Sequence, residues 1–152
     1  MQEIGRTYLL IADETEEGAA AARWLGEALH ADKGSRVVVL HVFVPAGQYG
    51  EPLPNGEWTE PVDVAMENRA RAAFSNVLPA LELAAERVRT VSRIGRTVEE
   101  IVAAAREEAA DAIVLGQSGG SPWRHVFRPT LAERLEREAP CPVVTISPAI
   151  AA

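Results

Sequence analysis

Short apolar runs alternate with segments of helical period along the chain. The runs are rich in β-branched residues and mostly lack the apolar–polar alternation of a half-exposed strand. Runs of this kind are typical of strands that are buried on both faces of a parallel sheet. The pattern therefore predicts five parallel strands, at residues 7–12, 36–44, 88–94, 112–115 and 142–146.

The segments between these runs place apolar residues along one side of a helix. They predict helices at residues 15–32, 62–87, 97–109 and 130–138. Thr97-Val-Glu-Glu100 and Thr130-Leu-Ala-Glu133 have the form of capping boxes, which begin helices. Pro79 lies inside the second helix and predicts a kink or break there, because proline lacks a backbone N–H.

The alternation of strands and helices predicts the fold class. It indicates one α/β domain over residues 1–152, with helices on both faces of an open, mainly parallel sheet. Ligands of such sheets bind beyond the carboxyl ends of the strands, where the strand order reverses. This rule points to Asp13, residues 42–45 and residues 116–130. Residues 45–60 have no period, and a loop of that length is a lid or a mobile segment; we expect mobility.

Composition and charge exclude several classes of function. The formal net charge is −7, and no block of lysine and arginine offers a surface for nucleic acid or for an anionic membrane. No apolar stretch approaches the roughly 20 residues that a membrane span needs. The amino terminus lacks the pattern of a signal peptide. The single cysteine, Cys141, fits a reducing compartment. We therefore expect a cytoplasmic protein.

A glycine-rich stretch follows the fourth apolar run. Gly116-Gln-Ser118-Gly-Gly120 matches the G-x-S-x-G pattern of a hydrolase nucleophile. In hydrolases a helix starts directly after that serine, whereas here two glycines, a serine and a proline follow. The acid and the histidine of a catalytic triad also do not follow Ser118 in the required order. The sequence shows no other acid–base or nucleophile pair, so we do not expect an enzyme.

The same glycines can let the backbone approach another group closely. Gly116 and Gly119 at the end of a buried strand can form an anion-binding nest, and the helix that begins at Thr130 offers a positive amino-terminal end. Arg124, His125 and Arg128 add positive charge between them. A plain glycine turn followed by a solvated basic loop explains these residues equally well, so the residues alone leave both interpretations open.

Two long stretches and one short motif resemble a known family. They are residues 100–116, residues 132–146, and the Ala-Pro-Cys-Pro run at 139–142. Together they resemble the universal stress protein family over essentially the whole chain. The resemblance implies a Rossmann-like parallel sheet of five strands in the order 3-2-1-4-5. It also implies a homodimer through the last strand, which contains Val143, Val144, Thr145 and Ile146. An apolar strand at the edge of a sheet is usually covered.

Members of the family that bind ATP carry the motif G-x2-G-x9-G-[S/T]. Gly116, Gly119 and Thr130 match this motif, but Pro129 stands where the last glycine is expected. The resemblance implies that the end of the first strand lies near the adenosine and that the backbone of residue 42 meets the adenine edge. It thus implies a nucleotide site made of Ala12, Asp13, Val42, Gly116, Gly119, Gly120, Arg128 and Thr130.

Pro129 alters that site for a physical reason. If the family's glycine donates its N–H to a phosphate, proline removes the donor, at a cost of about 1.5–3 kcal/mol or roughly ten- to a hundredfold in affinity. The Thr130 hydroxyl has a competing role as a helix cap. Glu14 adds a second carboxylate beside Asp13, which is unfavourable for a triphosphate unless Mg²⁺ intervenes.

Three interpretations of function follow. The leading one is a cytoplasmic, dimeric stress-response module that regulates or binds, with an altered nucleotide site or a site for another small anion. The first alternative is an ATP-binding member with at most slow hydrolysis, in which Mg²⁺ enters only together with ATP. The second alternative is an interaction protein whose cleft holds no ligand.

Overall fold

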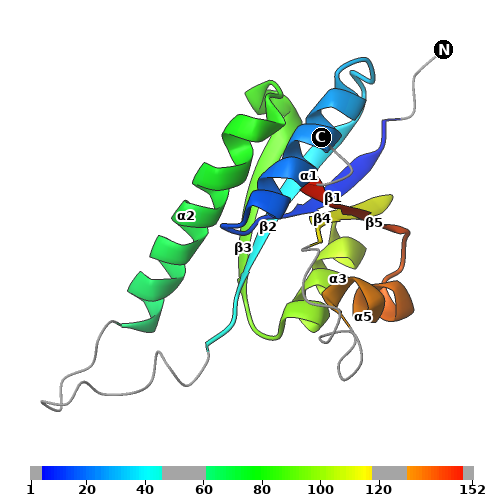
Figure 1. Cartoon of the computed structure of the whole chain (residues 1–152). Helices are drawn as coiled ribbons and strands as arrows, with labels where there is room; N and C mark the ends of the chain where they lie inside the picture. The colour runs from blue at the N-terminus through cyan, green and yellow to red at the C-terminus, as the bar shows by residue number, and fades with distance from the viewer. Residues whose placement is uncertain (1–4, 46–60, 118–129, 149–152) are drawn as a thin grey trace, which may run out of the picture.

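The computed structural model describes residues 5–45, 61–117 and 130–148 (Figure 1). Along the chain the strands and helices are β1 (Thr7–Ile11), α1 (Glu16–Leu29), β2 (Arg36–Phe43), α2 (Val62–Leu81), β3 (Val88–Ile94), α3 (Thr97–Glu107), β4 (Ala112–Gly116), α5 (Leu131–Glu138) and β5 (Val143–Ile146). A short 3-10 helix, Ala85–Arg87, precedes β3. Within the described ranges, no helix combines the length and the apolar character needed to cross a bilayer.

The five strands form one parallel sheet in the order β3-β2-β1-β4-β5. This confirms the predicted fold class and strand order. β1 lies at the centre, where Leu10 is level with Val39 of β2 and with Val114 of β4. The chain runs outward from β1 through β2 to β3 and then returns to the other side of β1 as β4. The strand order therefore reverses between β1 and β4.

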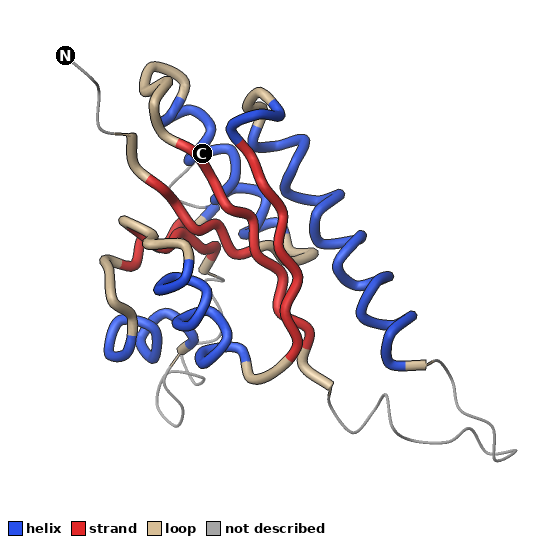
Figure 2. Tube along the Cα trace, turned by 180° about the vertical axis from the view of Figure 1, so that it is seen from behind, coloured by secondary structure: helices blue, strands red, loops and turns tan. Residues whose placement is uncertain are grey.

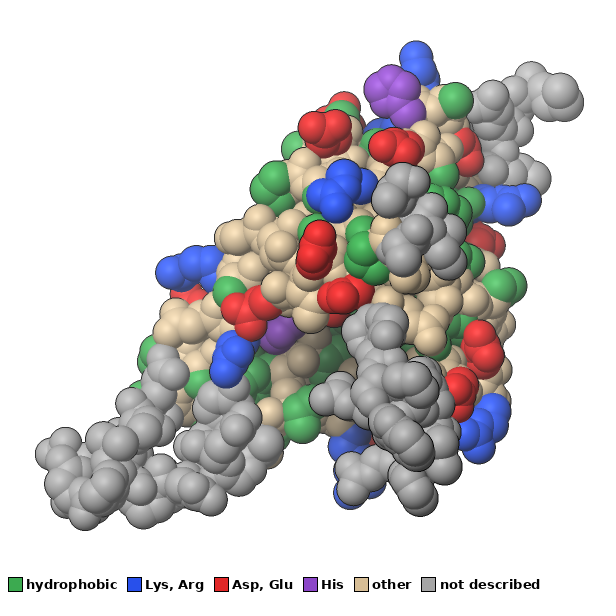
Figure 3. Space-filling model, viewed as in Figure 1, with side chains coloured by type: hydrophobic (Ala, Val, Ile, Leu, Met, Phe, Trp, Pro, Cys, Tyr) green, Lys and Arg blue, Asp and Glu red, His purple; other side chains and the backbone are tan. Residues whose placement is uncertain are grey.

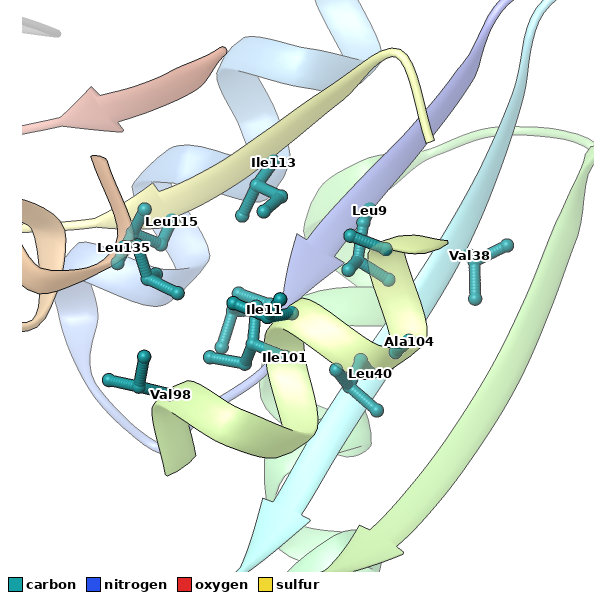
Figure 4. Close-up of a cluster of buried hydrophobic side chains, with 12 residues drawn as sticks. Leu9, Ile11, Val38, Leu40, Val98, Ile101, Ala104, Ile113, Leu115 and Leu135 are labelled. Atoms are coloured by element: carbon teal, nitrogen blue, oxygen red, sulfur yellow. The ribbon is translucent and has the colours of Figure 1, made fainter. Parts of the chain in front are cut away.

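Helices cover both faces of the sheet (Figures 1 and 2). Leu9 and Ile11 of β1 belong to the core cluster beneath α3 and α5, whereas Leu10 belongs to the cluster beneath α1 and α2. Figure 4 shows the first cluster, in which Ile101 of α3 and Leu135 of α5 contribute to the same core. Burial on both sides explains why the runs of β1, β2 and β4 lack alternation. The edge strand β3, in contrast, is mostly exposed or half-buried, unlike the buried strand that was expected.

Two of the helices begin with a threonine cap. The Thr15 hydroxyl accepts a hydrogen bond from the N–H of Gly18 at 3.0 Å, at the start of α1. The Thr130 hydroxyl accepts one from the N–H of Glu133 at 3.1 Å, at the start of α5. Such bonds satisfy N–H groups that have no partner within the helix. The predicted role of Thr130 as a helix cap is confirmed.

The capping box predicted at Thr97 is wrong. Thr97 is the first residue of α3, and the cap position belongs to Arg96, which makes no side-chain cap bond. The glutamate of the expected box, Glu100, is engaged elsewhere, because its carboxylate accepts a hydrogen bond from Nε of Arg93 at 2.8 Å. An interaction with the neighbouring strand β3 thus replaces the local one.

Helix α2 continues through Pro79 and ends soon after it, at Leu81. Because Pro79 has no N–H, the carbonyl of Ser75, four residues earlier, has no helical donor, and the helix ends two residues after the proline. Glu82 then adopts a left-handed backbone conformation, with φ of 48°. The helix is therefore not broken at Pro79 itself, but it ends at Leu81 and does not continue to Arg87 as predicted.

Helix α1 ends at Leu29, which is earlier than predicted, and Arg87 stabilises the chain after it. The Arg87 guanidinium donates hydrogen bonds to the backbone carbonyls of Leu29, Asp32 and Ser35. This clamp joins the turn between α1 and β2 to the start of β3.

Candidate functional site

The turn between β1 and α1 lies at the carboxyl end of the central strand. The Asp13 carboxylate accepts two hydrogen bonds through Oδ1, from the N–H of Thr15 at 2.9 Å and from its hydroxyl at 2.6 Å. Thr15 in turn caps α1. Ala12, just before Asp13, is buried and donates its N–H to the carbonyl of Leu40 at 2.7 Å. The orientation of Asp13 is therefore fixed by the helix start.

Asn76 of α2 holds the same turn from the other side. Its Nδ2 donates to the backbone carbonyl of Asp13 at 2.9 Å and to that of Thr15 at 2.8 Å. These residues are 63 and 61 positions away in the sequence. One amide group thus links α2 to the turn and limits its movement.

Gly116 ends β4 next to this turn, on the other side of the point where strand order reverses. A Cβ atom at Gly116 would lie 2.2 Å from the backbone carbon and oxygen of Glu17 in α1. The backbone of Gly116 is therefore closely approached, and the group that approaches it is the first turn of α1. The approach of an anion to this glycine stays a prediction. The next residue, Gln117, donates its N–H to the carbonyl of Ile146 at 2.8 Å.

Val42 lies inside β2 rather than after it, level with Arg93 of β3. In a parallel strand, successive residues direct their backbone N–H and C=O groups to opposite neighbours. The carbonyl of Leu40 accepts from Ala12 beside β1, and that of Phe43 accepts from Gly95 beside β3. By the same alternation, the N–H and C=O of Val42 point toward the β1 side of the sheet. They lie beyond Ile11, the last residue of β1 that pairs with β2.

His41 is the site residue that sequence analysis missed. Its ring contacts the edge of the Phe74 ring, with centroids 6.4 Å apart. Its Nδ1 is buried and has no hydrogen-bond partner among the residues that the structure describes. Burial is the main cause that lowers the pKa of His41; the negative charges of Glu14 and Asp13 oppose this shift, while Arg69 adds to it. A polar residue within an otherwise apolar run was the signal available in the sequence.

An ion pair near His41 joins the β1–α1 turn to α2. The guanidinium of Arg69 lies 3.1 Å from a carboxylate oxygen of Glu14, and both side chains are about half exposed. In Figure 3 the surface is hollowed at this end of the molecule, with acidic and basic side chains along its border. Glu14, whose charge we expected to disfavour a phosphate, is thus partly neutralised by Arg69.

Residues 118–129 of the predicted phosphate loop lie outside the described residues, and they include Gly119, Gly120, Arg124, His125, Arg128 and Pro129. The same holds for residues 46–60 of the loop predicted to be mobile at 45–60. In the part of the chain that the structure describes, no group of three or more histidine, cysteine, aspartate or glutamate side chains could hold a metal ion. The described part of the site thus combines a fixed aspartate, backbone groups of Val42 that point toward the β1 side, and one ion pair.

The fold defines an open, doubly wound α/β protein of the Rossmann-like kind. A profile of the universal stress protein family matches residues 6–147. A relative from Thermus aquaticus, named a universal stress protein in the QAH/OAS sulfhydrylase 3′ region, is 30% identical over 142 residues. That match covers 93% of this chain and 98% of the relative. The chain therefore belongs to the universal stress protein family, as the sequence resemblance implied.

Solved structures have the same fold. A universal stress protein in complex with cAMP is 15% identical, with a TM-score of 0.67 and coverage of 95% of this chain and 98% of that one. A family protein from Arabidopsis thaliana with AMP bound is 14% identical, with a TM-score of 0.59 and coverage of 93% and 91%. At these identities the likeness shows the shared fold.

Proposed function

We propose that this chain is a nucleotide-binding regulatory protein of the stress response. It acts in the cytoplasm and binds its ligand at the carboxyl ends of β1, β2 and β4, without catalysing a reaction. The observation that carries the proposal is the position of the Val42 backbone, which faces the reversal of strand order beside Asp13. The complexes of two fold relatives with cAMP and AMP support it.

The described groups suit an adenine nucleotide. The edge of adenine offers one hydrogen-bond donor beside one acceptor, and the C=O and N–H of Val42 complement them. Asp13 uses Oδ1 for its bonds to Thr15, so that Oδ2 can accept a hydrogen bond from a ribose hydroxyl. Backbone groups at the end of a buried strand are rigid, which favours binding because little freedom is lost.

The phosphate end of the site is altered in this proposal. The Thr130 hydroxyl is engaged as the cap of α5, and Gly116 is required for packing against α1. Pro129 has no N–H to donate. With fewer donors for phosphate, the site suits a nucleotide with one phosphate better than a triphosphate. ATP with Mg²⁺ remains the second candidate, because Gly116, Gly119 and Thr130 match the ATP motif.

Calorimetric titration of AMP, cAMP and MgATP into the full chain tests the proposal. Val42→Pro removes an N–H that β2 does not need for pairing. We expect this variant to bind AMP about tenfold more weakly than the wild type. Val44→Pro is the matched control, since Val44 lies exposed beyond the strand and should leave AMP affinity unchanged. Pro129→Gly should strengthen MgATP binding about ten- to a hundredfold.

The opposite results would favour the alternatives. Equal, micromolar binding of MgATP by the wild type and by Pro129→Gly would show that proline costs nothing and would favour a working ATP site. If neither protein binds any of the three nucleotides, the nucleotide proposal is wrong. The interpretation as an interaction protein with an empty cleft would then stand.

We further propose that the protein is a homodimer formed through β5, by Val143, Val144, Thr145 and Ile146. β5 lies at the edge of the sheet, and these residues are half-buried in the single chain. The carbonyls of Pro142 and Ile146 accept bonds from β4, so the backbone of Thr145 faces away from β4. An unpaired apolar edge of this kind favours association.

Substitution at Thr145 tests the dimer. Thr145→Pro removes an outward N–H without breaking a bond to β4 and should yield a monomer in sedimentation velocity. Thr145→Val keeps the N–H and should remain a dimer. A monomeric wild type, or a dimeric Thr145→Pro, would show that β5 is not the interface.

A further inference from the structure

The pair of Glu14 and Arg69 occupies the charged border of the proposed nucleotide site. Glu14 directly follows Asp13 in the β1–α1 turn, and Arg69 reaches it from α2, 55 positions away in the sequence. The two charged groups are 3.1 Å apart, with exposed side-chain fractions of 49% and 48%. An ion pair that is so exposed contributes little to stability, so another anion can replace the carboxylate at small cost.

The remaining charges at this border would otherwise repel an anion. The carboxylate of Asp13 is held at the start of α1 by two hydrogen bonds from Thr15. Glu14 adds a second negative charge. Arg69 is the cation that the described residues place beside them. A phosphate therefore needs Arg69 to turn toward it, and Arg69 must then leave Glu14.

We propose that Arg69 binds the phosphate of the nucleotide and that Glu14 occupies Arg69 when no ligand is present. This inference rests on the proposed nucleotide site. It names the two residues that set how strongly the site prefers a ligand with a phosphate over one without. A guanidinium offers two parallel N–H groups to a phosphate as readily as to a carboxylate. Asn76 holds the backbone of the turn, so the replacement of Glu14 by phosphate as the partner of Arg69, which we call the exchange, takes place through rotation of the two side chains.

The exchange predicts how substitutions combine. Calorimetry is done with the full chain as wild type, Glu14→Gln, Arg69→Gln and the double variant, with AMP and adenosine as probes. We expect Glu14→Gln to bind AMP about three- to tenfold more tightly and Arg69→Gln to bind it about three- to tenfold more weakly. Adenosine has no phosphate, so both variants should bind it within about twofold of the wild type.

The double variant separates the exchange from simple repulsion. If Glu14 acts by holding Arg69, then Glu14→Gln loses most of its effect on AMP once Arg69 is already glutamine. Glu16→Gln removes the same charge within the first turn of α1 and should change AMP affinity less than about twofold. Both members of the pair are half exposed, so thermal unfolding should show all variants folded at the assay temperature.

Each other result overturns the inference. If Glu14→Gln strengthens AMP binding equally with and without Arg69, Glu14 merely repels the phosphate. If Arg69→Gln weakens the binding of adenosine as much as the binding of AMP, Arg69 has a structural role. If adenosine binds but neither substitution changes the affinity for AMP, the proposed exchange is wrong, while the proposed nucleotide site is still supported. If the wild type binds neither probe, the proposed nucleotide site fails and the exchange with it.

Discussion

The absence of a side chain at Gly18 allows Asp13 to turn its carboxylate onto the start of α1. A Cβ atom at Gly18 would lie 2.1 Å from Oδ1 of Asp13, the atom that accepts both hydrogen bonds from Thr15. Gly18 lies in the first turns of a helix, where alanine is normally the better residue. Glycine at this position therefore serves the orientation of the candidate ligand residue rather than the helix.

Gly18→Ala should consequently have opposite effects in two backgrounds. In the wild type we expect it to lower the free energy of unfolding by about 1–2 kcal/mol, because Asp13 must give up its bonds to Thr15. In an Asp13→Ala background the clash is gone, and the same substitution should stabilise the protein by about 0.5–1 kcal/mol through helix propensity. Urea unfolding measures both values; equal losses in the two backgrounds would contradict the coupling.

Arg87 offers a prediction about stability away from the site. Its Nη2 alone donates to three backbone carbonyls at and after the end of α1, and the shorter side chain of lysine ends one bond before that position. Arg87→Lys should lower the free energy of unfolding by about 1–3 kcal/mol in urea titrations. The control is Arg71→Lys, whose exposed pair with Glu67 should cost less than about 0.5 kcal/mol. Similar losses for both variants would show that the carbonyl clamp adds nothing.

The fold could be predicted from the sequence because its signals are redundant. Runs of β-branched residues such as Val37 to Leu40 are buried on both faces, and periodic helices separate them. A close backbone approach at Gly116 was one of the two interpretations that the sequence left open, and the structure shows such an approach. Its partner in α1 could not be predicted, because contact between the end of one strand and the helix after another depends on how the elements pack.

Local motifs failed where a distant residue competed for the same atoms. The box at Thr97 needs Glu100, but Arg93 of β3 binds that carboxylate. His41 was overlooked because one polar residue in an apolar run gives no indication of its neighbours. Its proximity to Glu14 and Arg69 arises from the packing of α2 beside the β1–α1 turn. The charged part of the candidate site therefore had to be seen in three dimensions.

The end of α3 gives a prediction with a matched pair of substitutions. The sequence suggested that Ala109 continues the helix, but α3 ends at Glu107 and Ala109 has φ of 50°. Alanine is strained in this left-handed conformation and glycine is not. Ala109→Gly should therefore raise the free energy of unfolding by about 0.5–1 kcal/mol. Ala103→Gly, inside α3, should lower it by about 1 kcal/mol. Loss of stability in both variants would show that the αL strain is negligible.

His41 predicts a pH dependence of stability. Burial lowers the pKa of His41 below its ordinary value of 6.5, so the unfolded chain binds the proton more tightly than the folded protein does. The stability that comes from keeping His41 neutral is present above pH 6.5. It is lost progressively as the pH falls through 6.5 toward the lower pKa of the folded state. Wild-type protein should therefore lose stability on acidification partly because His41 must be protonated.

Urea unfolding at several pH values between 7.5 and 5 tests this for three proteins. His41→Gln cannot titrate at residue 41, so its free energy of unfolding should decrease less between pH 7.5 and 5 than that of the wild type. His30→Gln is the matched control, because His30 lies exposed at the end of α1 and should leave the wild-type slope unchanged. If the wild type and His41→Gln lose stability in parallel, the buried ring at residue 41 is not what acid disrupts.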